Sequence, residues 1–202
     1  MSRMIFGRIG MLALMSCVLL TAPVFAQDTA GEKRNALSRE DAAAAVSKLR
    51  MMVGSWDFEL EISHDTGRSW RVIPPTVATV SSIMDDKIIH EEFSGEFDST
   101  RVTSNRANFA FDRLNKVYRV CIADDDEGFL DVYQGNIVDN TLVVEDVTSG
   151  TLWPAADGRN YGFQIAWGLE PGDVRSYGVK ITVDDGATWY SYIRGTYTRR
   201  KD

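Results

Sequence analysis

Hydrophobic and polar residues alternate along most of the chain after Gly54, which is the pattern of half-buried β-strands. In SWDFELEIS (55–63), every second residue from Trp56 to Ile62 is apolar and the residues between them are polar. Similar segments follow at short intervals: 76–84, 88–93, 102–111, 117–123, 129–134, 141–147, 161–167, 177–183 and 189–198. Turn-forming sequences such as DDK, DRLNK, VDNT and EPGD separate most of them. The pattern therefore predicts about ten short strands.

Strands of this number with hairpin-length connections predict an all-β antiparallel meander. An open sheet of that size would expose two long edges, whereas closure into a barrel removes them and leaves room for one small ligand. A two-sheet sandwich is the competing architecture, because alternation alone does not distinguish the two. Pro74 and Pro75 are expected to mark a bend or an edge. A calycin-like closed barrel is the preferred prediction.

One helix is predicted before the first strand. Ser38 can cap its N-terminus, and Asp41 occupies the acidic position of a capping box. The following EDAAAAVSKLRMM consists mainly of helix-forming residues. Val46, Leu49 and Val53 give the helix one modest apolar face. We therefore expect a short helix that packs on the strands as a plug or lid.

The first 26 residues have the features of a secretory signal peptide. Arg3 and Arg8 accompany an apolar run over 9–20 that is too short to span a bilayer comfortably. Small residues end at Ala26, where a signal peptidase would cleave. An uncleaved anchor and a lipoprotein modified at Cys17 are alternatives that fit the flanking residues less well. We expect a periplasmic or secreted protein cleaved after Ala26.

The remainder is expected to be acidic, with a flexible leader over 27–37 and a single domain over 38–202. Cleavage removes two of the 22 basic residues and none of the 29 acidic ones, which leaves a net charge of −9. This charge excludes a general attraction to nucleic acid or to an anionic membrane. Only Cys121 remains, so no internal disulfide can form and a buried, unreactive thiol is expected.

Two stretches, SHDTGRSW (63–70) and TVDDGATW (182–189), fit one template that resembles the Asp-box of sialidases. A hairpin turn explains each residue type, since Asp accepts backbone N–H groups, Gly adopts a left-handed conformation and Trp packs beneath the loop. A propeller would need at least about four blades of roughly 40 residues or more, with the motif recurring at that period, whereas the two copies here lie 119 residues apart. The turn residues are Asp65, Gly67, Trp70, Asp184, Gly186 and Trp189.

The segment KLRMMVGSW resembles the start of lipocalins and of the wider calycin group of ligand-binding barrels, in which Gly-x-Trp opens the first strand. The resemblance implies that Trp56 closes one barrel end and that an arginine of the last strand lies across its ring. Arg194 is the candidate for that arginine. The motifs HEEFSG (90–95), FAFD (109–112) and DGATW (185–189) are similar to those of an uncharacterised bacterial family of secreted calycin-like proteins.

Signals for catalysis or metal binding are weak. The sequence has no Gly-x-Ser-x-Gly, His-Glu-x-x-His or Gly-rich phosphate motif. His90 and Glu92 share one face of a strand and suggest acid–base chemistry or half a metal site, but no further ligand completes the set. The acidic run 124–128 has Gly135 where a calcium loop needs a carboxylate, so a solvated turn is expected, with a weak cation site as the alternative. We expect no metal and no cofactor, and an enzyme is the less favoured class.

Ligand binding inside the barrel is the favoured function. With five Trp, seven Tyr and nine Phe, the chain has enough aromatic residues both to fill a core and to line a cavity. The candidate ligand-binding residues are Phe58, His90, Phe109, Phe111, Tyr133 and Trp167. The expected partner is a small apolar or amphipathic ligand, while the sequence defines neither its identity nor an oligomeric state. A filled barrel with a broad exposed apolar patch would indicate a structural or interaction role instead.

Overall fold

The computed structural model describes residues 35–96, 102–125, 128, 130–154 and 158–201. The predicted signal peptide and most of the predicted leader lie outside these residues. Within the described part, no helix has the length and apolar character needed to cross a membrane.

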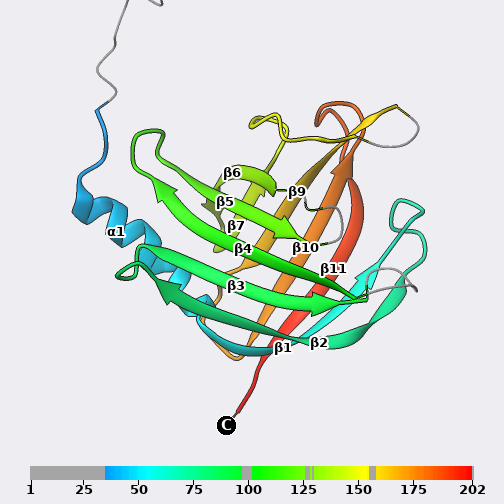
Figure 1. Ribbon diagram of the computed structural model, residues 1–202, viewed down its shortest axis with the longest axis horizontal. Coiled ribbons are helices and arrows are strands. Elements are labelled where there is room, and N and C mark those ends of the chain that lie inside the picture. The colour runs from blue at the N-terminus through cyan, green and yellow to red at the C-terminus, as the bar shows by residue number, and fades with distance from the viewer. Residues whose placement is uncertain (1–34, 97–101, 126–127, 129, 155–157, 202) are drawn as a thin grey trace, which may run out of the picture. The chain divides into compact units, whose positions relative to one another are not determined.

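Ten antiparallel strands form a closed barrel (Figure 1). They are β1 (Gly54–Ile62), β2 (Arg71–Ile83), β3 (Ile88–Gly95), β4 (Thr103–Asp112), β5 (Val117–Asp124), β6 (Leu130–Val138), β7 (Thr141–Glu145), β9 (Asn160–Gly168), β10 (Val174–Thr182) and β11 (Tyr190–Arg199). Closure occurs because β1 pairs with both β2 and β11, and β9 pairs with both β7 and β10. The short β8 (Trp153–Pro154) pairs with β9. The predicted barrel is confirmed, and it is not a two-sheet sandwich.

The prolines of β2 lie within the strand, at a bulge. Phe58 pairs with Thr76 and Leu60 pairs with Ile73, so Pro74 and Pro75 together face a single residue of β1. A bulge leaves backbone groups out of the hydrogen-bond ladder, so the missing N–H groups of proline are tolerated there.

A helical segment covers one end of the barrel. Helix α1 (Arg39–Ser47) is capped by Ser38, whose hydroxyl accepts the Asp41 N–H at 3.0 Å, and the 3₁₀ helix η1 (Lys48–Met52) follows directly. Leu49 and Met52 are fully buried in the barrel core. Ion pairing of Arg50 with Asp86 ties the segment to the turn between β2 and β3. We call this end the closed end.

Trp56 and Arg199 meet at the closed end. The Trp56 indole N–H donates to the Met52 carbonyl at 2.8 Å, and the Arg199 guanidinium carbon lies 4.1 Å from the Trp56 ring centroid. Arg199 also donates to the Val53 carbonyl at 3.0 Å. Gly54 permits this approach, because a Cβ at that position would lie 2.4 Å from a guanidinium nitrogen of Arg199. The Gly-x-Trp motif therefore provides space for the arginine that covers the tryptophan.

Arg194 has a different position from the one suggested by the calycin resemblance. Arg199 is opposite Trp56 in the β1–β11 register, whereas Arg194 is opposite Glu61, five residues farther along β1. Arg194 pairs with Glu61 at 2.5 Å and lies 4.3 Å from the Trp70 ring centroid. The register between the strands determines which arginine reaches Trp56.

The two Asp-box stretches form the β1–β2 and β10–β11 turns. Asp65 accepts the Ser69 N–H at 2.8 Å, and Asp184 accepts the Thr188 N–H at the same distance. Gly67 and Gly186 have φ values of 88° and 85°, in the region that favours glycine. Both turns lie opposite the closed end, because successive turns of a meander alternate between its two ends. We call their end the open end.

Candidate ligand cavity

The barrel encloses a cavity of about 340 Å³ toward its open end. Inward-facing residues of the strands form its wall, and His64 and Trp153 contribute to its rim. The lining combines large aromatic side chains with smaller ones such as Ala107 and Val179. Toward the closed end, other large side chains fill the barrel core.

Two of the residues selected from the sequence line the cavity. Tyr133 is 5% exposed and Trp167 is 1% exposed. The Trp167 ring is held by edge contacts with Phe109, at 5.0 Å between centroids, and with Tyr177, at 5.7 Å. Tyr177 also lines the cavity. Rings that support one another in this way form a rigid apolar wall.

Phe58, Phe109 and Phe111 do not line the cavity. Phe58 and Phe109 are fully buried in the core, and Phe58 stacks on Tyr197 with ring centroids 3.8 Å apart. Phe111 packs edge-on against Tyr118 at 5.1 Å. All three point inward, but they lie nearer the closed end than the residues that line the cavity.

Glu91 lies in the cavity wall, although it was not among the candidates chosen from the sequence. It is 1% exposed, and its carboxyl is 3.6 Å from the guanidinium of Arg175, which is 3% exposed. The Arg175 guanidinium carbon lies 4.0 Å from the Tyr197 ring centroid and 4.4 Å from that of Trp56. Burial raises the pKa of Glu91, and the positive charge of Arg175 opposes the rise. Glu91 could have been identified from the sequence, because its carboxyl lies on the same strand face as the apolar Ile89.

A second acidic group lies on the other side of the cavity. Asp131 is 5% exposed and accepts hydrogen bonds from the Val132 N–H at 2.8 Å and from the Thr151 hydroxyl. Asp146, which is fully buried, accepts the Phe163 N–H at 2.7 Å. Burial raises the pKa of Asp146 to about 7, and the nearby charge of Asp131 adds to the rise.

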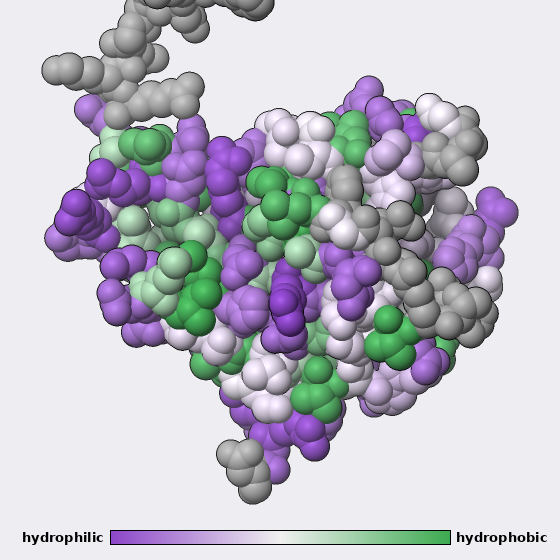
Figure 2. Space-filling view, in the orientation of Figure 1, coloured by the Kyte–Doolittle hydropathy of each residue, from purple (hydrophilic) through white to green (hydrophobic). Residues whose placement is uncertain are grey.

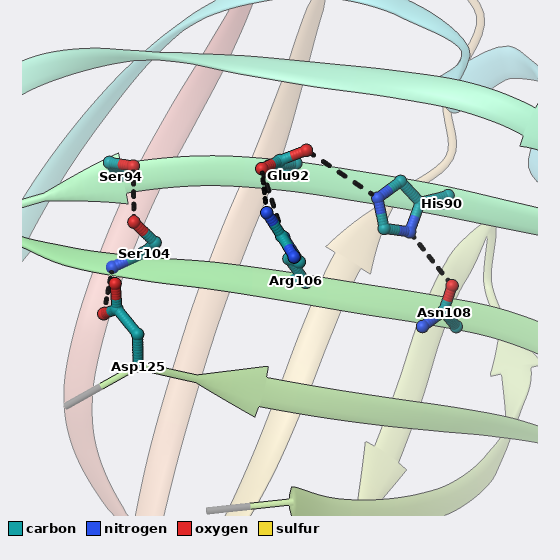
Figure 3. A network of polar contacts seen from close by, with 7 residues as sticks. All are labelled: His90, Glu92, Ser94, Ser104, Arg106, Asn108 and Asp125. Carbon is teal, nitrogen blue, oxygen red and sulfur yellow. Dashed lines mark hydrogen bonds and ion pairs between the residues drawn. The ribbon is translucent and has the colours of Figure 1, made fainter. Parts of the chain in front are cut away.

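His90 and Glu92 lie on the outer surface of the barrel, in a polar network across β3 and β4 (Figure 3). His90 Nδ1 is 3.0 Å from the side-chain oxygen of Asn108, and Nε2 is 3.9 Å from Glu92. Glu92 in turn pairs with Arg106 at 3.0 Å. Neither His90 nor Glu92 lines the cavity. Across the described residues, no three His, Cys, Asp or Glu side chains are grouped as a metal site would require.

The remaining residues noted in the sequence lie in varied surroundings. His64 is exposed at the rim, with its ring 6.1 Å from that of Tyr192. Asp125 accepts the Ser104 N–H at 2.7 Å, while residues 126–127 of the acidic run lie outside the described residues. Cys121 is half-buried, and burial raises the pKa of its thiol, which disfavours the reactive thiolate.

A closed antiparallel barrel with a helix over one end and a cavity toward the other defines a calycin-like β-barrel protein. The chain belongs to the family described as "Protein of unknown function (DUF1579)", whose sequence model matches residues 43–199. No curated protein matches the sequence.

Two solved structures that are similar to this chain have low sequence identity to it. Rv2717c from M. tuberculosis is similar with a TM-score of 0.51 and 11% identity, over 78% of this chain and 98% of that one. An S-type phycobiliprotein lyase, CPES from Guillardia theta, has a TM-score of 0.48 and 13% identity, over 82% and 99% of the two chains. The likeness to Rv2717c supports the barrel fold alone.

Proposed function

We propose that this protein is a periplasmic or secreted binding protein that holds a small amphipathic ligand in the barrel lumen. The observation that carries the proposal is the cavity of about 340 Å³, whose wall combines aromatic and aliphatic side chains with a few buried polar groups. Sites for small molecules typically have this composition, since apolar area provides affinity and a few polar groups select the ligand.

The buried polar groups favour a binding site over a simple scaffold. Glu91 and Arg175 are both almost fully buried, and burying an ion pair costs more than packing apolar residues of similar size. The Glu91 Oε1 atom and the guanidinium nitrogens of Arg175 make no hydrogen bond with any described residue. A barrel selected only for stability would be expected to have apolar residues there.

The other two functions considered from the sequence have less support. His90 and Glu92 lie outside the cavity, which leaves acid–base chemistry at this pair without an enclosed substrate site. On the face shown in Figure 2, hydrophobic residues form small separate groups among hydrophilic ones. That face therefore lacks the broad apolar patch expected of an interaction scaffold.

Binding of an uncharged fluorescent probe, N-phenylnaphthylamine, tests the lumen directly. Ala107 lines the cavity and is 5% exposed, so Ala107→Phe should fill the space and weaken probe binding about tenfold or more. Ala110 lies on the outer face of the same strand, and Ala110→Phe is the matched control that should leave binding unchanged. Equal affinity in the two variants, or no binding by the wild type, would contradict the proposal.

The proposed location is tested separately. The charged start, the apolar run and the small residues before Gln27 are the features that support export and cleavage. Expression of the full chain in a Gram-negative host should yield a periplasmic protein whose N-terminal residue is Gln27. Recovery of the intact N-terminus from the cytoplasm would contradict this part of the proposal.

A further inference from the structure

The carboxyl groups around the cavity outnumber the strong bases. Glu91, Asp124 and Asp131 line it, and no described lysine or arginine does. Arg175 contacts Glu91 but does not itself line the cavity. The exposed imidazole of His64 lies at the rim. A bound ligand would therefore meet a surface with more negative than positive charge.

Asp131 is the carboxyl in this wall whose charge is least balanced. Its hydrogen-bond donors, the Val132 N–H and the Thr151 hydroxyl, are neutral, and it makes no ion pair with another described residue. Asp146 lies behind it, fully buried, and Asp146 Oδ2 has no hydrogen-bond partner among the described residues. Ionising both of these neighbouring buried carboxyls without a cation is costly, and a positive charge brought by a ligand would offset that cost.

The charge of Glu91, on the opposite side of the cavity, is already balanced. Glu91 Oε1 lies 3.6 Å from the guanidinium of Arg175, and both side chains are almost fully buried. Asp131 is therefore the carboxyl at which a positive charge of the ligand would be placed.

Aromatic rings flank the acidic wall. The Phe163 ring lies 6.3 Å from that of Trp153 and 6.2 Å from that of Tyr192, and all three residues line the cavity. The backbone N–H of Phe163 binds Asp146, so these rings are tied to the acidic pair. Aromatic faces beside carboxylates are the surroundings in which proteins bind organic cations.

We propose that the ligand is an organic cation, with a protonated amine beside Asp131 and an apolar body against the aromatic wall. This inference rests on the proposed lumen binding and adds the charge of the ligand. An anionic ligand would be disfavoured. The buried cation Arg175 does not line the cavity, and the Glu91 carboxyl lies between Arg175 and the lumen. The ammonium group would contribute a positive charge and hydrogen-bond donors beside Asp131.

Three ligands that differ only in their end group test the proposal: phenylbutylamine, phenylbutanol and phenylbutyrate. Their affinities are measured by calorimetry at neutral pH and constant ionic strength, on the full chain as it is processed in the cell. The amine should bind about tenfold more tightly than the alcohol, and the carboxylate more weakly than either. Asp131→Asn should remove the advantage of the amine and leave the affinity for the alcohol unchanged.

Unchanged affinity for the alcohol would show that the Asp131→Asn variant is folded. The variant should fold, because the asparagine keeps an oxygen that can accept the Val132 N–H. Asp85→Asn is the matched control, because Asp85 is an exposed carboxyl in the turn at the closed end. If no member of the series binds, the lumen-binding proposal itself fails. If the alcohol or the carboxylate binds as tightly as the amine, or if Asp131→Asn keeps the preference, lumen binding stands and the inferred charge is wrong.

Discussion

The guanidinium of Arg175 lies 3.6 Å from the carboxyl of Glu91 beneath the cavity, and both side chains are almost fully buried. The pair joins the two parts of the barrel interior. Arg175 contacts the rings of Trp56 and Tyr197 in the closed end, whereas Glu91 faces the lumen. The floor of the cavity therefore depends on how the closed end is packed.

Removal of one member of this pair should destabilise the protein strongly. Glu91→Ala leaves the Arg175 charge buried without a partner, which is expected to lower the free energy of unfolding by about 3–5 kcal/mol. The double variant Glu91→Leu with Arg175→Met buries no charge and should lose less stability than the single variant. Urea unfolding of the three proteins measures the differences. If the double variant is the least stable, the charges contribute net stability and this account of the pair is wrong.

The contact between Arg199 and Trp56 should also matter for stability. Arg199→Ala removes the stacking on the indole and the hydrogen bonds to the Val53 and Met51 carbonyls, so a loss of about 1–3 kcal/mol is expected in chemical unfolding. Arg194 is a matched control on the same strand, since its ion pair is largely exposed. Arg194→Ala should cost less than about 1 kcal/mol. Equal losses would show that covering Trp56 has no special role.

The first Asp-box turn should contribute to loss of stability in acid. Hydrogen bonds from the Ser69 hydroxyl and N–H, and from Ser63, hold the pKa of Asp65 well below its ordinary value of 3.8. The folded state therefore keeps Asp65 ionised when the unfolded chain has taken up a proton, and stability falls as the pH drops below about 4. Asp65→Ala should reduce the fall in melting temperature between about pH 6 and about pH 3. An unchanged fall would contradict the role of Asp65.

Much of the fold could be predicted because alternation with a period of two identifies the buried face of each strand. Alternation says nothing about the height of a residue along the barrel axis. Phe58 and Trp167 both point inward, yet Phe58 fills the core and Trp167 lines the cavity. The sequence of one strand also does not reveal its register with a neighbouring strand. For that reason Arg194 was expected at the position that Arg199 occupies. Glu91 could have been found, since a carboxyl on a core-facing position is unusual.

The contribution of Asp146 to stability should depend on pH in the opposite sense to that of Asp65. The pKa of Asp146 is raised from its ordinary value of 3.8 to about 7 in the folded protein, mainly because burial disfavours the carboxylate. Between these values the folded state keeps a proton that the unfolded chain releases. The free energy of unfolding should therefore decrease as the pH rises from about 4 to about 7, and the full cost is present above about pH 7.

Asp146→Asn isolates this effect, because an asparagine oxygen can still accept the Phe163 N–H and the side chain no longer titrates. One pKa unit corresponds to about 1.4 kcal/mol, so the variant should be more stable than the wild type by about 1–4 kcal/mol at about pH 8 and similar to it at about pH 4. Urea unfolding across this range measures the difference, with Asp85→Asn as the exposed control. Parallel curves for Asp146→Asn and the wild type would show that the folded protein leaves Asp146 ionised. An organic cation beside Asp131 should favour the ionised form of Asp146, so saturation with phenylbutylamine is expected to reduce the difference between the two curves.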